Sequence, residues 1–290
     1  MRDHGTALAL KLPDRLAGRA LRWFLYVVVL LIFVTPLWSI LTTTLSGVPL
    51  KVGQLTLLPT KFTMSNLTAA WHFGVGRGLL NSSIVVGVAL FLQVTVSAFA
   101  AYALARKRFR FMGLVTLLIL ATMMMPEEII AIPLYLVLHA IPEPFTGGTL
   151  LNSFGGLILP LVGWALPIYV LTQFMRTIPT ELEESARVDG AGEFTIFFRI
   201  ILPLCKPALG TCAVFGFLMI WDQYLLPLLV TQTPNMYTLT LVVTNLQSSQ
   251  ELGQGVRLAA ALVLLVPSIV VYLGLQRFFE RGLLTGSLKG

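Results

Sequence analysis

Charged residues are scarce in this sequence. Only 11% of the 290 residues are Asp, Glu, Lys or Arg, whereas 56% are hydrophobic, and the mean hydropathy is +0.85. Soluble domains usually carry about 25% charged residues, so the composition excludes an ordinary soluble domain and indicates a membrane protein. The net charge of +7 does not indicate nucleic-acid binding, because the basic residues lie between the apolar runs and form no aromatic-lined cluster.

Cysteine is scarce as well, with Cys205 and Cys212 the only two. On a helix this spacing places them on one face but two turns apart, too far for a disulfide, so we expect two buried thiols. The sequence has no CxxC motif or Cys/His cluster, so we expect no metal site. It also lacks a G-x-x-x-x-G-K-[ST] phosphate loop, so the chain cannot supply an ATP site of that kind.

Long apolar runs, in contrast, are abundant. A transmembrane helix needs about 20 mostly apolar residues, and six runs meet this requirement. They cover approximately residues 23–45, 80–105, 112–138, 151–175, 207–230 and 257–276. Prolines within or near several runs predict kinks. The sequence therefore predicts an all-α, polytopic membrane protein with one six-helix domain over residues 23–276.

The positions of Lys and Arg predict the orientation of this domain. If the N-terminus is cytoplasmic, 16 of the 20 basic residues lie on the cytoplasmic side. This bias is typical of the positive-inside rule. We therefore expect the segments 1–22 and 277–290 to be cytoplasmic, together with the connection at about 176–206 between the fourth and fifth helices.

Part of that connection, residues 178–203, differs from its neighbours. It reads IPTELEESARVDGAGEFTIFFRIILP and is rich in acids. Thr180 is a natural N-cap, and Glu183, three residues later, would complete a capping box. Gly190 can adopt the left-handed conformation that ends a helix. The first half of the 178–203 segment is therefore predicted to be a short helix with both ends marked.

A second short helix is predicted from near Glu193 to the break at Leu202–Pro203. Its Phe and Ile residues form an apolar face that must be buried. Helices that lie among lipid headgroups favour Lys and Arg on their polar face, whereas this segment is acidic. We therefore interpret the 178–203 segment as a docking site for a protein partner, with an interfacial helix as the alternative.

The same segment matches a family pattern. Glu184-Ser185-Ala186, three residues, Gly190, nine residues and then Ile200-Ile201-Leu202-Pro203 resembles the E-A-A-x3-G-x9-I-x-L-P loop of ATP-binding-cassette importer permeases. Ser185 stands at the second position of the pattern, where its first alanine usually is. The stretches NSSIVVG, WDQYLLPLLVT and RGLLTGSLKG are similar to the maltose-type sugar-importer subunit, although Ser287-Leu288 replaces Ala-Val in the tail. The resemblance covers most of the chain from about residue 20.

This resemblance implies a permease subunit of a bacterial importer in the plasma (inner) membrane, without covalent chemistry or a cofactor of its own. The implied partners are a second homologous permease, two copies of a cytoplasmic ATPase that bind ATP and Mg, and an extracytoplasmic solute-binding protein near residues 231–255. The implied substrate is a di- or oligosaccharide, while glycerol phosphates stay open. Coupling to the ATPase is assigned to Glu184, Ser185, Ala186, Asp189, Gly190, Ile200, Leu202 and Pro203. A role of these residues in folding the loop alone is the alternative.

Polar residues within the apolar runs are candidates for the translocation path. Asp222 would lie near the bilayer centre, where a carboxylate costs about 2.5–3.5 kcal/mol on insertion scales, so it should face a cavity or a partner. Gln223 and Tyr224 beside it could bind a sugar. A structural carboxylate at Asp222 is the alternative.

Glu127 and Glu128 follow Pro126 in the third run and are further candidates for the path. Pro126 could break the helix and place both acids at a water-filled opening. Alternatively, the two acids and Asp222 could relay ions, which would make the chain an ion-coupled secondary transporter. That hypothesis leaves the 178–203 segment without a role.

Overall fold

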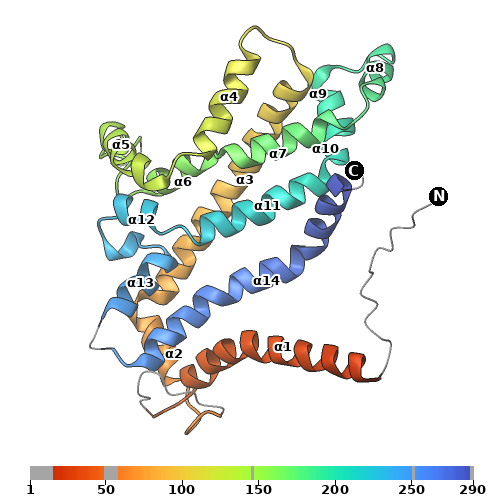
Figure 1. The fold of residues 1–290 in the computed structure, drawn as a ribbon. Helices are drawn as coiled ribbons and strands as arrows, with labels where there is room; N and C mark the ends of the chain where they lie inside the picture. Colours follow the sequence, from red (N-terminus) through yellow and green to blue (C-terminus); the bar gives the residue numbers. More distant parts are fainter. Residues whose placement is uncertain (1–15, 49–57, 145–146, 250–251, 288–290) are drawn as a thin grey trace, which may run out of the picture.

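The computed structural model describes residues 16–48, 58–144, 147–249 and 252–287. Within these residues the chain is helical and contains no strand beyond two isolated bridges, Ser46 with Phe62 and Pro142 with Thr149 (Figure 1). The all-α prediction is therefore confirmed. Residues 1–15 of the predicted N-terminal segment and 288–290 of the predicted tail lie outside the described residues.

The structure describes fourteen α-helices along the chain. They are α1 (Leu16–Thr44), α2 (Ser65–Ala70), α3 (Gly76–Arg106), α4 (Met112–Met123), α5 (Glu127–Ala140), α6 (Phe154–Val162), α7 (Ala165–Arg176), α8 (Glu181–Val188), α9 (Glu193–Ile196), α10 (Leu202–Leu204), α11 (Lys206–Trp221), α12 (Leu225–Val230), α13 (Leu239–Ser248) and α14 (Gln254–Ser287). Two π-helical turns, Trp71–Val75 and Phe197–Ile201, join helices that lie end to end, and a 3₁₀ turn, Pro234–Met236, precedes α13.

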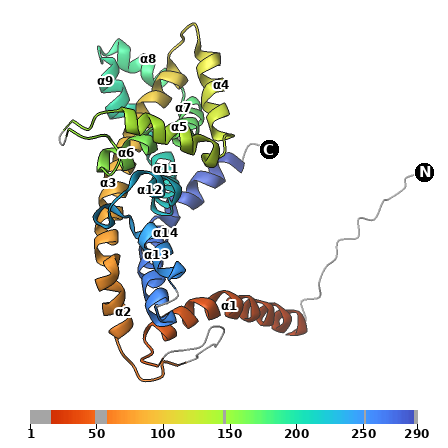
Figure 2. The ribbon, with the colours of Figure 1, turned by 90° about the vertical axis from the view of Figure 1, so that its left-hand side faces the viewer.

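Four helical runs in the described part of the chain are long and apolar enough to cross a membrane. They are Leu21–Thr44, Ser65–Arg106, Phe154–Arg176 and Gln254–Gly274. Two further pairs, α4 with α5 and the Glu193–Leu204 arm with α11, meet this criterion together but bend where they join. When each bent pair counts as one crossing by length and composition, the number is six, as predicted, although the Glu193–Leu204 arm of the fifth pair belongs to the connection that is predicted to be cytoplasmic. α1 leaves the bundle and packs mainly on α14 (Figure 2).

The third predicted run, 112–138, is not one straight helix. α4 ends at Met123, α5 begins at Glu127, and the two helices are bent by 107°. Pro126 explains the break, because it precedes α5 with an extended backbone (φ −60°, ψ 136°) and proline disfavours the helical conformation in the residue before it.

The fifth and sixth predicted runs also need correction. The run 207–230 stops at Trp221 and resumes as α12 at Leu225. Pro227 accounts for this, because in a continuous helix it would offer no N–H to the carbonyl of Gln223 and its ring would clash there. α14 extends the sixth run, 257–276, at both ends, so most of the predicted tail is helical.

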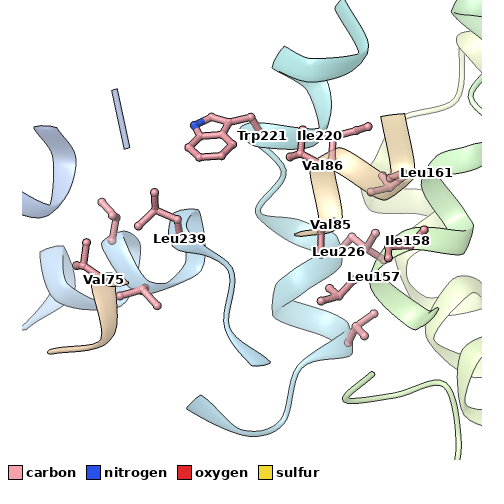
Figure 3. Close-up of a cluster of buried hydrophobic side chains, with 14 of the residues drawn as sticks. Val75, Val85, Val86, Leu157, Ile158, Leu161, Ile220, Trp221, Leu226 and Leu239 are labelled. Carbon is pink, nitrogen blue, oxygen red and sulfur yellow. The ribbon is translucent and has the colours of Figure 1, made fainter. Parts of the chain in front are cut away.

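The core divides into two clusters along α3. The first surrounds Val85 and Val86 with side chains from α6, α11, α12 and α13, of which Leu157, Ile158 and Leu226 lie nearby in Figure 3. The second joins Ala98 and Ala101 of α3 to α7, α8, the π turn and α11. Between the clusters lies Gln93, which is fully buried and donates from Nε2 to the carbonyl of Leu161 at 2.8 Å. α3 is therefore the central helix of the fold.

Gly156 shows how close this packing is. A Cβ at Gly156 would overlap the backbone carbonyl oxygen of Leu150. We expect Gly156→Ala to destabilise the protein by about 1–3 kcal/mol, the usual cost of overpacking. Gly113→Ala is the matched control, because a Cβ there meets open space. Thermal unfolding in detergent measures both, and equal midpoints for the two variants would contradict the expectation.

Candidate functional site

The first helix of the 178–203 segment begins differently from the prediction. Thr180 has helical backbone angles (φ −70°, ψ −23°), and its side chain makes no capping hydrogen bond. Instead, its carbonyl accepts hydrogen bonds from the N–H groups of Glu183 at 2.9 Å and Glu184 at 3.0 Å. The predicted capping box of Thr180 and Glu183 is therefore wrong, because the Glu183 carboxylate is bound elsewhere.

The end of this helix is as predicted. Gly190 has a φ of +82°, which only glycine adopts readily. The N–H of Gly190 donates to the carbonyl of Arg187 at 3.0 Å, and the N–H of Ala191 donates to that of Ala186 at 2.9 Å. This pair of bonds is the Schellman motif, and Ala186 and Ala191 pack in the same cluster.

The second predicted helix is also present. α9 begins at Glu193 and continues through the π turn into α10, one residue beyond the predicted break at Leu202–Pro203. Phe197 and Ile201 are buried, and the Phe197 ring stacks on Phe99 of α3 with centroids 4.9 Å apart. Phe194 and Phe198 stay exposed, so the apolar face is only half covered.

The eight residues predicted to couple to the ATPase occupy different environments. Glu184, Ser185, Asp189, Gly190 and Pro203 are exposed. Ala186 is buried, and Ile200 and Leu202 are partly buried against the second cluster. The exposed members in α8 and at its end, together with Val188, which is 88% exposed, are accessible to a partner.

A buried ion pair attaches the 178–203 segment to α3, and sequence reasoning missed it. Arg106 Nε lies 2.5 Å from Glu183 Oε1 as an ion pair without the alignment of a hydrogen bond, and their side chains are 6% and 3% exposed. Arg106 Nη2 also donates to the carbonyl of Ile178 at 2.8 Å. The basic run after the second apolar run and the acids of the segment were the available signal.

A second set of contacts holds α9. Glu193 Oε1 lies 2.7 Å from Lys107 Nζ and 3.2 Å from Arg187 Nη2, and Tyr102 Oη donates to Glu193 Oε2 at 2.9 Å. The hydrogen bonds from Lys107 and Tyr102 lower the pKa of Glu193 below its ordinary value of 4.5. Arg187 also lies 3.5 Å from Glu183, so the two helices share one charge network.

The lowered pKa of Glu193 gives this network a pH dependence. Glu193 stabilises the fold above its ordinary pKa of 4.5, and the stabilisation is lost as the pH falls through the lower folded-state pKa. We expect Glu193→Gln to lower the thermal midpoint at pH 7, and this difference to shrink in acid below pH 4.5. Glu181→Gln, at an exposed acid of α8, is the control. A difference that persists unchanged in acid would contradict the assignment.

The candidates for the translocation path separate into two groups. Glu127 and Gln223 line a cavity of about 340 Å³ between α4, α5, α6, α7, α11 and α12. Gln223 Nε2 donates to Glu127 Oε2 at 3.4 Å. Glu128, Asp222 and Tyr224 are exposed and are not among the lining residues.

Three helices begin at this cavity. The first residues of α5, α7 and α12, which are Glu127, Ala165 and Leu225, all line it. Helix N-termini carry unpaired N–H groups that can donate to a ligand. Trp164, which sequence reasoning missed, adds an aromatic face.

The two cysteines, Cys205 and Cys212, are buried and free, as predicted.

Comparison with known proteins identifies the family. The model of the binding-protein-dependent transport system inner membrane component matches residues 93–285. The sn-glycerol-3-phosphate transport system permease protein UgpE of Yersinia pestis bv. Antiqua (strain Antiqua) is 36% identical over 240 residues, which are 80% of this chain and 83% of that protein. The alpha-glucoside transport system permease protein AglG of Rhizobium meliloti (strain 1021) is 36% identical over 239 residues, 80% of this chain and 62% of that protein. The diacetylchitobiose uptake system permease protein NgcG of Streptomyces coelicolor is 34% identical over 237 residues, 80% of this chain and 76% of that protein.

Solved structures support the fold. A chain of a bacterial ABC transporter involved in the import of the acidic polysaccharide alginate matches with a TM-score of 0.78 and 20% identity, over 91% of this chain and 96% of that chain. None of these comparisons supports an ion-coupled secondary transporter. The chain belongs to the family of inner membrane components of binding-protein-dependent transport systems and is a permease subunit of an ATP-binding-cassette importer.

Proposed function

We propose that this permease imports a neutral sugar of the di- or oligosaccharide class. The observation that carries the proposal is the composition of the cavity. Among the described lining residues, Glu127 is the one charged side chain, and Lys, Arg and His do not occur. A phosphate favours Arg or Lys partners, and a carboxylate at the site would repel it.

The cavity also has the groups that a polyhydroxyl solute needs. Glu127 accepts hydrogen bonds, Gln223 donates and accepts them, and Trp164 offers an apolar ring face. The volume of about 340 Å³ lies within the usual range of small-molecule sites. Two relatives are named for an alpha-glucoside and for diacetylchitobiose, which agrees with this chemistry. Asp222, Tyr224 and Glu128 do not line this cavity and are not part of the proposed site.

The 178–203 segment would be the docking site for a separate ATPase. Its exposed residues Glu184, Ser185, Asp189 and Gly190 are available to that partner, whereas Ala186 and Leu202 support the segment from within. The complete importer would contain a second homologous permease, two ATPase copies that bind ATP and Mg, and a solute-binding protein near residues 231–255. The distribution of Lys and Arg supports cytoplasmic positions for both termini.

Uptake by the reconstituted importer tests the substrate class. The permease is co-purified with the products of neighbouring genes and placed in liposomes that contain ATP. We expect uptake of labelled disaccharides such as maltose or diacetylchitobiose, and none of sn-glycerol-3-phosphate. Uptake of the phosphate ester with no neutral sugar transported would contradict the proposal. Glu127→Gln, which keeps the shape of the side chain, is expected to weaken sugar uptake without removing the cavity.

A further inference from the structure

α3 is a long, unbroken α-helix. It comprises 31 residues from Gly76 to Arg106 and contains no proline, so at 1.5 Å per residue it is about 46 Å long. The other long helices in the described part, α1 and α14, contain Pro36 and Pro267. The remaining crossings are bent or interrupted. Figures 1 and 2 place α8 near one end of α3 and α13 beside its other half.

One end of α3 is attached to the 178–203 segment. In the described part of the chain, the ion pairs that leave this segment all end on Arg106 and its neighbour Lys107. Arg106 holds α8 through Glu183, and Lys107 and Tyr102 hold α9 through Glu193. Both short helices are thus attached to the last turn of α3 and the residue that follows it, so a movement of the two helices as a unit would act on this end of α3.

The other end of α3 is attached to the connection between α12 and α13. Asn81 Nδ2 donates to the carbonyls of Asn235 at 2.8 Å and Tyr237 at 2.9 Å, and the Asn81 side chain is fully buried. The N–H of Leu239 donates to Ser82 Oγ at 2.8 Å. A Cβ on Gly78 would lie 3.0 Å from the Leu239 Cα, so the backbones are in close contact.

From these two attachments we infer that α3 is a strut that transmits movement between the ATPase-docking segment and the connection at residues 231–238 on the opposite side. The inference rests on the proposed docking role of the 178–203 segment. Rigid helices with specific contacts at both ends can carry coupling between distant sites, and the required evidence is a measured coupling. Arg106 and Asn81 are the positioning residues of the two ends.

The experiment uses a thiol reporter in the assembled complex. Gln232, an exposed residue of the connection, is replaced by cysteine, while both native thiols are buried. The rate of its reaction with a polar maleimide is measured with ATP and vanadate and without nucleotide. We expect the two rates to differ in the otherwise unchanged chain, because closure of the ATPase moves α3 and the connection attached to it.

Variants at either end of α3 test whether the movement is transmitted through this helix. Arg106→Glu and Asn81→Ala are each expected to reduce the nucleotide effect about fivefold or more, the lower range of typical allosteric couplings. The double variant should reduce the nucleotide effect no more than the single variants do, because Arg106 and Asn81 lie on the same route through α3. Glu183→Arg in the Arg106→Glu background should restore the effect. Arg108→Glu, the same change at an exposed residue nearby, should leave it intact.

Several outcomes would overturn the inference. One is a nucleotide effect that stays unchanged in both Arg106→Glu and Asn81→Ala. Another is a double variant in which the nucleotide effect falls by the product of the two single reductions. If Arg106→Glu does not assemble, Lys107→Gln with Tyr102→Phe removes only the attachment to α9 and should still reduce the effect. A permease that recruits no ATPase would refute the docking proposal itself, whereas a complex that hydrolyses ATP with no effect at position 232 would refute only the strut.

Discussion

Replacement of Glu183 by leucine is expected to destabilise the 178–203 segment by about 3–5 kcal/mol, the usual cost when one partner of a buried ion pair is removed. The reason is that Arg106 would keep its charge in a site where its side chain is 6% exposed. Thermal unfolding in detergent and the rate of protease cleavage within the segment measure the loss.

Two further variants test the explanation. Arg106→Met combined with Glu183→Leu should recover most of the stability, because no charge is then buried without a partner. Glu184→Leu changes the adjacent, exposed acid in the same way and should alter the free energy of unfolding by less than about 0.5 kcal/mol. Equal losses from Glu183→Leu and Glu184→Leu would show that the ion pair contributes nothing specific.

The second large effect is expected at Gly190. Gly190→Val forces a β-branched residue to a φ of +82°, which costs about 1–3 kcal/mol. The strain would distort the end of α8, where the exposed residues proposed to meet the ATPase lie. We expect the affinity of the permease for its ATPase to fall about tenfold, which corresponds to 1.4 kcal/mol.

The matched control for this variant is Gly192→Val, two residues later. Gly192 has a φ of −74° and a ψ of 162°, which valine adopts easily, and a Cβ there meets open space. Titration of the purified permease in nanodiscs with the ATPase gives both affinities. If Gly192→Val weakens binding as much as Gly190→Val, contact with the partner and not backbone strain determines the effect.

The sequence predicted those parts of the molecule that depend on local signals. Gly190 and the two short helices around it were found because a helix end requires a left-handed residue, and a run of Phe and Ile requires burial. The membrane crossings were found from their length. Pro126 and Pro227 were visible in the sequence, but whether a proline kinks a helix or turns it by 107° depends on what packs beside it.

The parts that were missed depend on contacts between distant residues. Thr180 and Glu183 have the spacing of a capping box, yet a buried arginine more than 70 positions earlier in the chain attracts the glutamate more strongly than the nearby N–H group does. Likewise, Trp164 and Glu127 share a cavity only because α5 and α7 both begin there. Asp222 was a candidate because it lies far inside an apolar run of the sequence. In the structure α11 ends at Trp221, one residue before Asp222, and the Asp222 side chain is exposed.

The division of the core along α3 has a consequence for how the protein opens. The two apolar clusters are separated by the polar side chains of Gln93 and Ser97, which are both fully buried. Apolar groups that share no contacts lose their structure independently, so the chain should contain two cooperative units that exchange their amide hydrogens with solvent at different rates. The unit around Ala98 and Ala101 includes α8 and the π turn after α9 and can loosen on its own. Local opening of that unit would release the 178–203 segment from α3 while the cluster around Val85 and Val86 stays packed.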